Sequence, residues 1–474
     1  MAGLFHTLNI GSESLYATRQ GVDTAGHNIA NAQVEGYSRQ RVNLTQRDPL
    51  ETMGILIGNG AHVESITRSH DNFIENQLNK AHQESGRASA RAESMKSIEE
   101  IFSPDLNASI SDEATKFFNS LQNLSNFPAD ATVRTAVVEA GRDIAAAFRR
   151  VDGDLKANRQ GLNEKIYDLA HKVTDGAREI ANLNVKIQIS EAGIGEVAND
   201  LRDQRDKLVR DLSQQIEIKY YEDEHGMLSV RGPNQVTLVD GGHSCSVNLE
   251  RNNENDGLYD VSIMDWEGHT NRNVTKRMDG GAMEALLQVR DTDAVNLIDK
   301  NNTMAATLIG EVNRVHQQGY GLGDFSESKG RDFFKPVESF DGAAANFAVD
   351  DAIAESNDAI GAASSVNAPG DNVNLNQIIQ LKDKRMFADD NVTLNGYYSN
   401  LTGGLGLDVV RSEHMRAANA VLVSNLNQKR ESVSGVSLDE EAANMMKWQA
   451  NFTASSKVIT TIDEMLDTVL QLKR

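Results

Sequence analysis

Residues 435–474 read GVSLDEEAANMMKWQANFTASSKVITTIDEMLDTVLQLKR, and this stretch decides the fold. Its apolar and small side chains recur at alternating intervals of three and four residues, which is the spacing of a narrow coiled-coil seam. The helix is predicted to begin after Ser437, because a hydroxyl cap and the acidic residues 439–441 satisfy the free amides and the dipole of a helix start. The predicted seam consists of Met445, Trp448, Phe452, Ser455, Ile459, Ile462, Leu466 and Val469.

A seam of this length needs a partner. At 1.5 Å per residue the helix is about 50 Å long, and nothing immediately before it can cover such a surface. The N-terminal stretch offers a matching stripe, Leu8, Leu15, Val22 and Ile29, with the small residues Gly11, Thr18 and Ala25 between them. An amphipathic helix on the chain's own core is the alternative interpretation. Two narrow terminal seams favour a two-helix stalk with one edge left for other subunits.

Charge and composition exclude several classes of partner. The net charge of −22 argues against binding to nucleic acid or to an anionic membrane. The two ends are nearly neutral and the middle carries almost all of this charge, so the ends can pack closely while the middle faces solvent. No apolar run approaches the ~18 residues of a membrane span, and the start lacks the pattern of a cleaved signal peptide. We therefore expect the protein to stay in the cytoplasm or to leave by a route that reads no cleaved signal.

The pattern along the chain predicts a mainly α protein with an inserted β domain. Residues 1–35 and 436–474 are expected to form the paired terminal helices, and residues 36–217 and 278–435 a bundle of long helices. Glycines 193 and 195 are expected to interrupt the longest helix, and residues 55–66 to form a β-hairpin around Gly58-Asn59-Gly60. Short β-rich runs separated by Gly, Asn and Asp turns predict a small β-rich outer domain at residues 218–277.

The sequence contains no motif on which to build an enzyme. It lacks HExxH, CxxC, a P-loop and GxSxG, and its 11 histidines are scattered singly. Cys245 follows a histidine, but no orienting carboxylate accompanies it, so a buried small residue is the preferred interpretation. We expect no catalytic residue, no metal site and no cofactor.

Several short motifs resemble flagellar axial proteins, the family of rod, hook and hook-associated proteins. The N-terminal signature comprises Asn28, Asn31, Gly36, Tyr37, Arg39 and Gln40. Further stretches favour the hook-associated members over rod and hook proteins, and these are residues 57–60, 66–68, 199–206, 280–281, 289–291 and 312–319. Residues 435–441 and 457–459 also match the family pattern. Val34 and Glu35 depart from the usual family residues before the Gly36 turn. The chain is also compact for the family.

The resemblance implies a structural subunit of the bacterial flagellum at the junction between hook and filament. It implies export of the unfolded chain by the flagellar type III pathway and assembly through the terminal helices. The implied partners are the hook protein, hook-associated protein 3, copies of the same chain in a ring, and an export chaperone on the C-terminal helix. The alternatives are another axial protein, of the rod or hook, or an assembly-associated hydrolase. A hydrolase would need a carboxylate pair or a set of metal ligands, and none stands out in the sequence.

Overall fold

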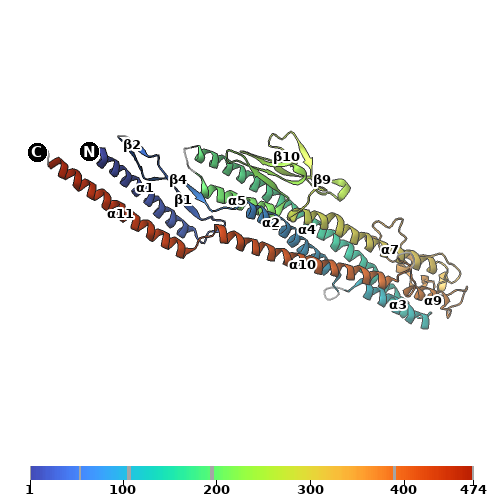
Figure 1. The fold of residues 1–474 in the computed structure, drawn as a ribbon. Helices are drawn as coiled ribbons and strands as arrows, with labels where there is room; N and C mark the ends of the chain where they lie inside the picture. The colour runs from blue at the N-terminus through green and yellow to red at the C-terminus, as the bar shows by residue number, and fades with distance from the viewer. Residues whose placement is uncertain (1, 53–54, 104–107, 193–196, 388–390, 472–474) are drawn as a thin grey trace.

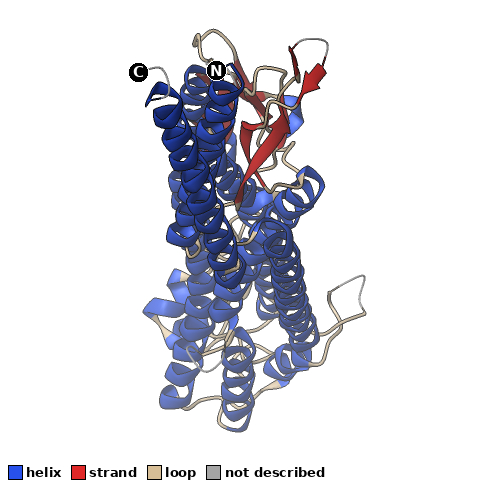
Figure 2. Ribbon diagram, turned by 60° about the vertical axis from the view of Figure 1, so that its left-hand side comes forward, coloured by secondary structure: helices blue, strands red, loops and turns tan. Residues whose placement is uncertain are grey.

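A computed structural model describes residues 2–52, 55–103, 108–192, 197–387 and 391–471 of the chain. The molecule is elongated, with a body of long helices, a small β region on one flank, and an arm of two helices at one end (Figure 1). The arm consists of α1 (Ala2–Asn31) and α11 (Leu438–Gln471). The two chain termini lie side by side in both views (Figures 1 and 2). The mainly α fold with paired terminal helices is confirmed.

The body is organised around α4, a helix of 61 residues. Asp130 begins it by accepting hydrogen bonds from the amides of Thr132 and Val133. Aromatic side chains from α3 and from the loop after α7 fill the core at one end, where the Phe117 ring lies 5.4 Å from that of Phe333. The principal body helices are α2 (Asn72–Phe102), α3 (Ile110–Asn126), α4 (Ala131–Glu191), α5 (Asn199–Gln215), α6 (Gly281–Gln288), α7 (Ala294–His316) and α10 (Leu394–Ser434).

Shorter elements complete the body. Between α7 and α10 the chain forms α8 (Asp351–Glu355) and α9 (Val373–Ile379), with loops and isolated β-bridges around them. The expected break of the longest helix at glycines 193 and 195 lies outside the described residues. On either side of that segment, α4 ends at Glu191 and α5 begins at Asn199.

The strands after α1 pair differently from the expected hairpin. β3 (Ile55–Ile57) pairs with β2 (Leu50–Thr52), and β4 (Ala61–Arg68) pairs with β1 (Gln40–Gln46), both antiparallel. The predicted pairing of residues 55–57 with 61–66 is therefore wrong. The β1–β4 register places Val42 opposite Ile66, an apolar pair that the expected hairpin would not form. Gly60, at φ +76°, turns the chain from one pair of strands into the other.

The β-rich segment forms two small antiparallel sheets beside α4 (Figure 1). One has the order β5-β6-β7-β8 and the other β11-β10-β9. Val230, Val239 and Val261 are fully buried and belong to the same continuous core as the apolar face of α4. The strands are β5 (Lys219–Glu222), β6 (Leu228–Arg231), β7 (Thr237–Asp240), β8 (His243–Ser244), β9 (Ser246–Asn252), β10 (Leu258–Met264) and β11 (Asn271–Asn273).

Candidate assembly interface

The arm is held together by small residues of α1 packed against larger side chains of α11. A Cβ atom added at Gly21 would lie 2.3 Å from the Trp448 ring, and one at Gly11 would lie 2.9 Å from the Ile459 side chain. Between these points the hydroxyls of Ser14 and Ser455 share a hydrogen bond of 2.7 Å. The close approach thus depends on the absence of a side chain at two positions of α1.

The predicted seam residues lie on both sides of this contact, with different degrees of burial. On α1 all four, Leu8, Leu15, Val22 and Ile29, are half-buried, whereas Gly11, Ala17, Thr18, Gly21, Thr24, Ala25 and Asn28 are buried. On α11 Ile462 is buried, and Met445, Trp448, Ser455, Ile459 and Leu466 are half-buried. Phe452 and Val469 are exposed. The structure therefore brings the two seams together but leaves part of the α11 seam uncovered.

Sequence reasoning undervalued the small residues. Positions 11, 14, 18, 21, 25 and 28 of α1 repeat at alternating intervals of three and four, and all carry Gly, Ser, Thr, Ala or Asn. That spacing is a second seam, and it is the one on which α11 lies. The apolar residues spaced by seven lie at its edges.

At the base of the arm a buried amide ties three chain segments together. Asn28 is 1% exposed, and its Nδ2 donates to the carbonyl of Gln40 at 2.9 Å and to Glu441 Oε2 at 3.0 Å. Its Oδ1 accepts from the Tyr37 hydroxyl at 2.7 Å and from the Gln40 amide at 2.9 Å. All four hydrogen-bonding positions of the side chain are used. We call Asn28, Tyr37, Arg39, Gln40 and Glu441 the elbow cluster.

Arg39 holds the start of α11 to the strand after the Gly36 turn. Its guanidinium pairs with Glu441 Oε1 at 2.6 Å and with Glu440 Oε2 at 2.9 Å, and its amide donates to the Ser434 carbonyl at 2.8 Å. The acidic first turn of α11, expected only to favour the helix dipole, thus also anchors the arm. Asn31, the remaining signature residue of α1, donates to the His27 carbonyl at 3.0 Å and closes the helix end.

A second, buried layer of charges supports the Gly36 turn. Glu75 of α2 accepts from Arg210 of α5 at 2.9 Å and from Arg430 of α10 at 2.7 Å. Arg430 also donates to the Gly36 carbonyl at 3.0 Å. Gly36 has φ +87°, and a Cβ there would lie 3.0 Å from the Arg210 guanidinium. The positive φ favours glycine here, and an added Cβ would in addition crowd the Arg210 side chain.

The first turn of α5 joins the elbow to the body. Asp203 accepts from the Ser38 amide at 2.7 Å and from Arg68 at 2.8 Å, and Asp200 accepts from the Gln40 side chain at 2.7 Å. Burial raises the pKa of Asp203, although Arg68 and the Ser38 amide oppose this shift. Burial, with the nearby Asp200, Asp203 and Glu441 carboxylates, also raises the pKa of Tyr37. Tyr37 therefore stays a neutral donor to Asn28.

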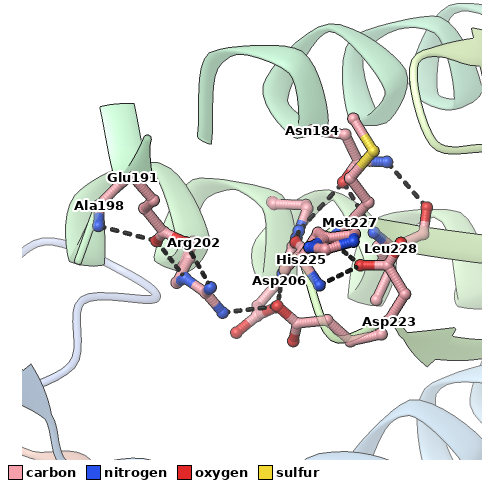
Figure 3. Close-up of polar contacts among 12 residues, drawn as sticks. Asn184, Glu191, Ala198, Arg202, Asp206, Asp223, His225, Met227 and Leu228 are labelled. Atoms are coloured by element: carbon pink, nitrogen blue, oxygen red, sulfur yellow. Dashed lines mark hydrogen bonds and ion pairs between the residues drawn. The ribbon is translucent and has the colours of Figure 1, made fainter. Parts of the chain in front are cut away.

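Further along, the same helix anchors the β region (Figure 3). Arg202 pairs with Glu191 at 2.7 Å, across the segment between α4 and α5, and with Glu222 at 2.5 Å. Arg205, which is fully buried, donates to Asn184 Oδ1 at 3.0 Å and to the Gly226 carbonyl at 2.7 Å. Asn184 in turn donates to the Leu228 carbonyl at 2.8 Å. The motif at residues 199–206 is thus structural, with Asp200 and Asp203 bound to the elbow and Arg202 and Arg205 bound to the first β sheet region.

The motif at residues 312–319 fixes the far end of the body. Asn313 accepts from the amides of Phe333 and Phe334 and donates to the Phe334 carbonyl at 2.7 Å. His316 is buried between the Arg331 carbonyl and the Gly361 amide, each at 2.8 Å. The amide can only donate, so His316 Nε2 accepts and its Nδ1 carries the proton. Burial lowers the pKa of His316 to about 4.

The described residues offer little for ligand chemistry. They contain no group of three or more His, Cys, Asp or Glu side chains placed to hold a metal ion. Cys245 is buried, and burial raises the pKa of its thiol, which disfavours the reactive thiolate. None of the helices in the described part of the chain combines the length and the apolar character that a membrane span requires.

Comparisons with known proteins agree with this architecture. Residues 95–334 match the family model of the helical domain of flagellar hook-associated protein FlgK, and residues 427–472 match that of the flagellar basal body rod FlgEFG protein C-terminal region. Flagellar hook-associated protein 1 of Bacillus subtilis is 26% identical, over 99% of this chain and 98% of the relative. The protein of that name from Salmonella typhimurium is 24% identical, over 98% and 99%.

A solved structure shares the fold. The flagellar hook junction protein FlgK from Burkholderia pseudomallei superposes with a TM-score of 0.68 at 15% identity, covering 76% of this chain and 100% of that one. Paired terminal helices, a long-helix body and a signature turn at their meeting point define a structural protein of the flagellar axis. Within that class, the chain belongs to the family of flagellar hook-associated protein FlgK. The resemblance seen in the sequence is confirmed, and the protein is a component of the bacterial flagellum.

Proposed function

We propose that the protein forms the junction between hook and filament and assembles there through its terminal helices. The observation that carries the proposal is the arm, which extends beyond the body (Figure 1) and leaves apolar side chains exposed. On α11 Met465 is 51% exposed and Leu470 62% exposed, and Phe452, Val458 and Val469 are also exposed. Copies of the same arm, arranged as a ring, would bury these side chains.

The remaining parts of the proposal concern partners and order of assembly. The hook protein lies on one side of the ring and hook-associated protein 3 on the other, and an export chaperone covers the C-terminal helix before assembly.

The proposal also divides the chain into three domains. Residues 1–35 and 436–474 form the inner domain, residues 36–217 and 278–435 the helical domain, and residues 218–277 an outer β domain. Two helices alone are marginally stable in water. The arm is therefore expected to open transiently in the single chain and to be held closed when neighbours cover it, which couples its stability to assembly.

Export of the unfolded chain by the type III pathway fits the composition. One cysteine precludes an internal disulfide, and six prolines limit slow isomerisation during refolding. The elbow cluster also suits a chain that refolds after export. Its hydrogen bonds join residues far apart in sequence, so they are expected to form after the local helices. The arm would remain open until the body is in place.

Deleting residues 438–474 tests the proposal. In cells whose only copy carries the deletion, we expect hooks without filaments and flagellin in the medium, while the purified protein keeps the melting transition of its body. A sharper variant combines Phe452→Glu with Val469→Glu, and Ile189→Glu on α4 is the matched control. Ile189 is 71% exposed and belongs to α4, outside the two arm helices. Filaments on the double variant, or collapse of the whole fold on deletion, would contradict the proposal.

A further inference from the structure

Helix α10 is apolar on two opposite faces, and α2 covers one of them. Toward the body it buries Leu401, Leu405 and Val409. On the opposite side Leu407 is 73% exposed and Val421 60% exposed. A helix that is apolar all round is ordinarily buried on every side, so the second face needs a covering that the single chain does not supply.

The uncovered face has the spacing of a helix-packing seam. At 100° per residue, positions 407, 410, 414, 418 and 421 fall within a narrow sector pointing away from α2. They carry Leu, Val, His, Ala and Val, with Leu422 at the margin. Val410 and Leu422 are exposed as well. We call Leu407, Val410, Ala418, Val421 and Leu422 the α10 stripe.

Charge indicates what can approach the stripe. Residues 414–428 contain no aspartate or glutamate, although the chain has 69 acidic residues among 474. Two copies of a protein with net charge −22 repel each other over most of their surfaces. This stretch lies between Glu413, which is paired with Arg416, and Lys429, so it is a surface on which a second acid-rich copy can lie.

A hollow beside the stripe gives the contact a place for an inserted side chain. Its volume is 280 Å³, and it lies between α2 and α10, lined by three arginines (Arg87, Arg91, Arg411), two acidic residues (Glu84, Asp408) and Met415 among others. Arg87 and Arg91 are already paired, with Glu84 and Asp293 respectively. Arg411 makes no ion pair within the described part of the chain. With three arginines against two acidic residues in its lining, the hollow suits a side chain that is apolar along its stem and carries an acceptor for Arg411 at its tip.

We propose that the α10 stripe is covered by a neighbouring copy of this chain, so that the interface between copies continues from the arm onto the body. The inference rests on the proposed function. Its geometric support is that α10 continues the line of α11 along one edge of the molecule (Figure 1). The contact is heterologous, since the α10 stripe meets a different face of the neighbour, and such contacts close into a ring where the rotation between copies closes.

Photo-crosslinking of assembled flagella tests the inference. Benzoylphenylalanine replaces Val421 in the full chain, in cells with no other copy, and Ile189 serves as the control position of similar exposure. We expect irradiation to give a species of twice the chain's mass from position 421, in at least tenfold excess over position 189. Crosslinks only to other flagellar proteins, equal yields at the two positions, or no crosslink would overturn the inference.

A substitution gives an independent measurement. Val421→Glu is expected to leave the circular dichroism of the purified protein unchanged and to lower the number of filaments per cell at least tenfold. Ile189→Glu is expected to change neither the circular dichroism nor the number of filaments. Wild-type filament numbers with Val421→Glu would overturn the inference. The same crosslinker at Phe452 separates the two proposals. Crosslinks between copies from position 452 without any from 421 would refute the α10 contact alone, and their absence at 452 would refute the arm as the assembly interface.

Discussion

Asn28 near the end of α1 and Glu441 in the first turn of α11 are 413 positions apart and share a hydrogen bond of 3.0 Å in a buried site. The same carboxylate pairs with Arg39 at 2.6 Å. One acidic side chain therefore fastens the start of the last helix to both the end of the first helix and the strand that follows it. This is the point at which the two ends of the chain become one unit.

Replacing Asn28 by Ala should loosen the elbow. The change leaves the Gln40 amide, the Tyr37 hydroxyl and Glu441 without their buried partner, at a cost of about 2–3 kcal/mol. Hydrogen exchange of residues 37–46 and 438–445 should accelerate by roughly 30- to 140-fold, since each 1.4 kcal/mol is a factor of ten. Asn9→Ala, at an exposed position of the same helix, is the control. Unchanged exchange at both segments would show that the cluster does not hold the arm.

Gly21→Ala should separate the arm helices, because the added methyl would overlap the Trp448 ring. On an exposed helix surface, replacing Gly by Ala stabilises the helix by up to about 1 kcal/mol. A loss of stability in Gly21→Ala would therefore report the clash with Trp448, whereas a gain would report helix propensity alone. In a Trp266→Phe background Trp448 is the only tryptophan, and its emission should shift to the red. Gly153→Ala, on α4 with nothing within 4 Å of the new atom, should be neutral or stabilising. An unshifted spectrum for Gly21→Ala would mean that the two helices are not in contact.

The fold was largely predictable because its helices carry periodic signals. The α11 seam repeats at intervals of three and four without interruption, and this alone indicates a paired helix. Such a pattern does not report which face of the partner is used, so the sequence predicts only a subsidiary role for Gly11 and does not single out Gly21. The exposed side of α10 escaped notice for a related reason. With apolar residues on two opposite faces, no single amphipathic stripe stands out.

The elbow cluster could be anticipated only by resemblance. Its hydrogen bonds join Asn28, Arg39 and Glu441 across hundreds of residues, and polar pairs leave no periodic trace in a sequence. The mistaken hairpin has a similar origin. Glycine at position 60 marks a turn, but not which strands pair on either side of it. The pairing is decided by apolar partners such as Val42 and Ile66, and these are apparent only when the register is known.

Stability of the body should fall between pH 6.5 and 4. His316 has its pKa lowered by burial to about 4 from an ordinary value of 6.5, so the unfolded chain binds a proton in this range and the folded chain does not. Stability is therefore complete above pH 6.5 and declines as the pH falls toward 4, by up to about 3 kcal/mol for this one group. Urea unfolding at pH 7 and pH 5 measures the difference.

His316→Gln should flatten that dependence while lowering stability at pH 7, since an amide cannot reproduce the imidazole's position between the Arg331 carbonyl and the Gly361 amide. His269→Gln changes an exposed side chain and should leave the profile as it is in the wild type. A variant at 316 with the full wild-type pH dependence would assign the effect to other groups.

Glu75 and Glu431 offer a paired test of the charges beneath the elbow, because both contact Arg430 from different environments. Glu75 is buried and also pairs with Arg210, whereas Glu431 is 63% exposed in its side chain. Glu75→Gln removes the carboxylate shared by two buried guanidinium groups, which should destabilise the body by about 3–5 kcal/mol. Glu431→Gln should change it by no more than about 1 kcal/mol, as for an exposed ion pair. Equal shifts of the urea midpoint in the two variants would show that burial does not set the strength of the ion pairs made by Arg430. The elbow would then be held by the hydrogen bonds of Asn28 and of the Gly36 carbonyl instead.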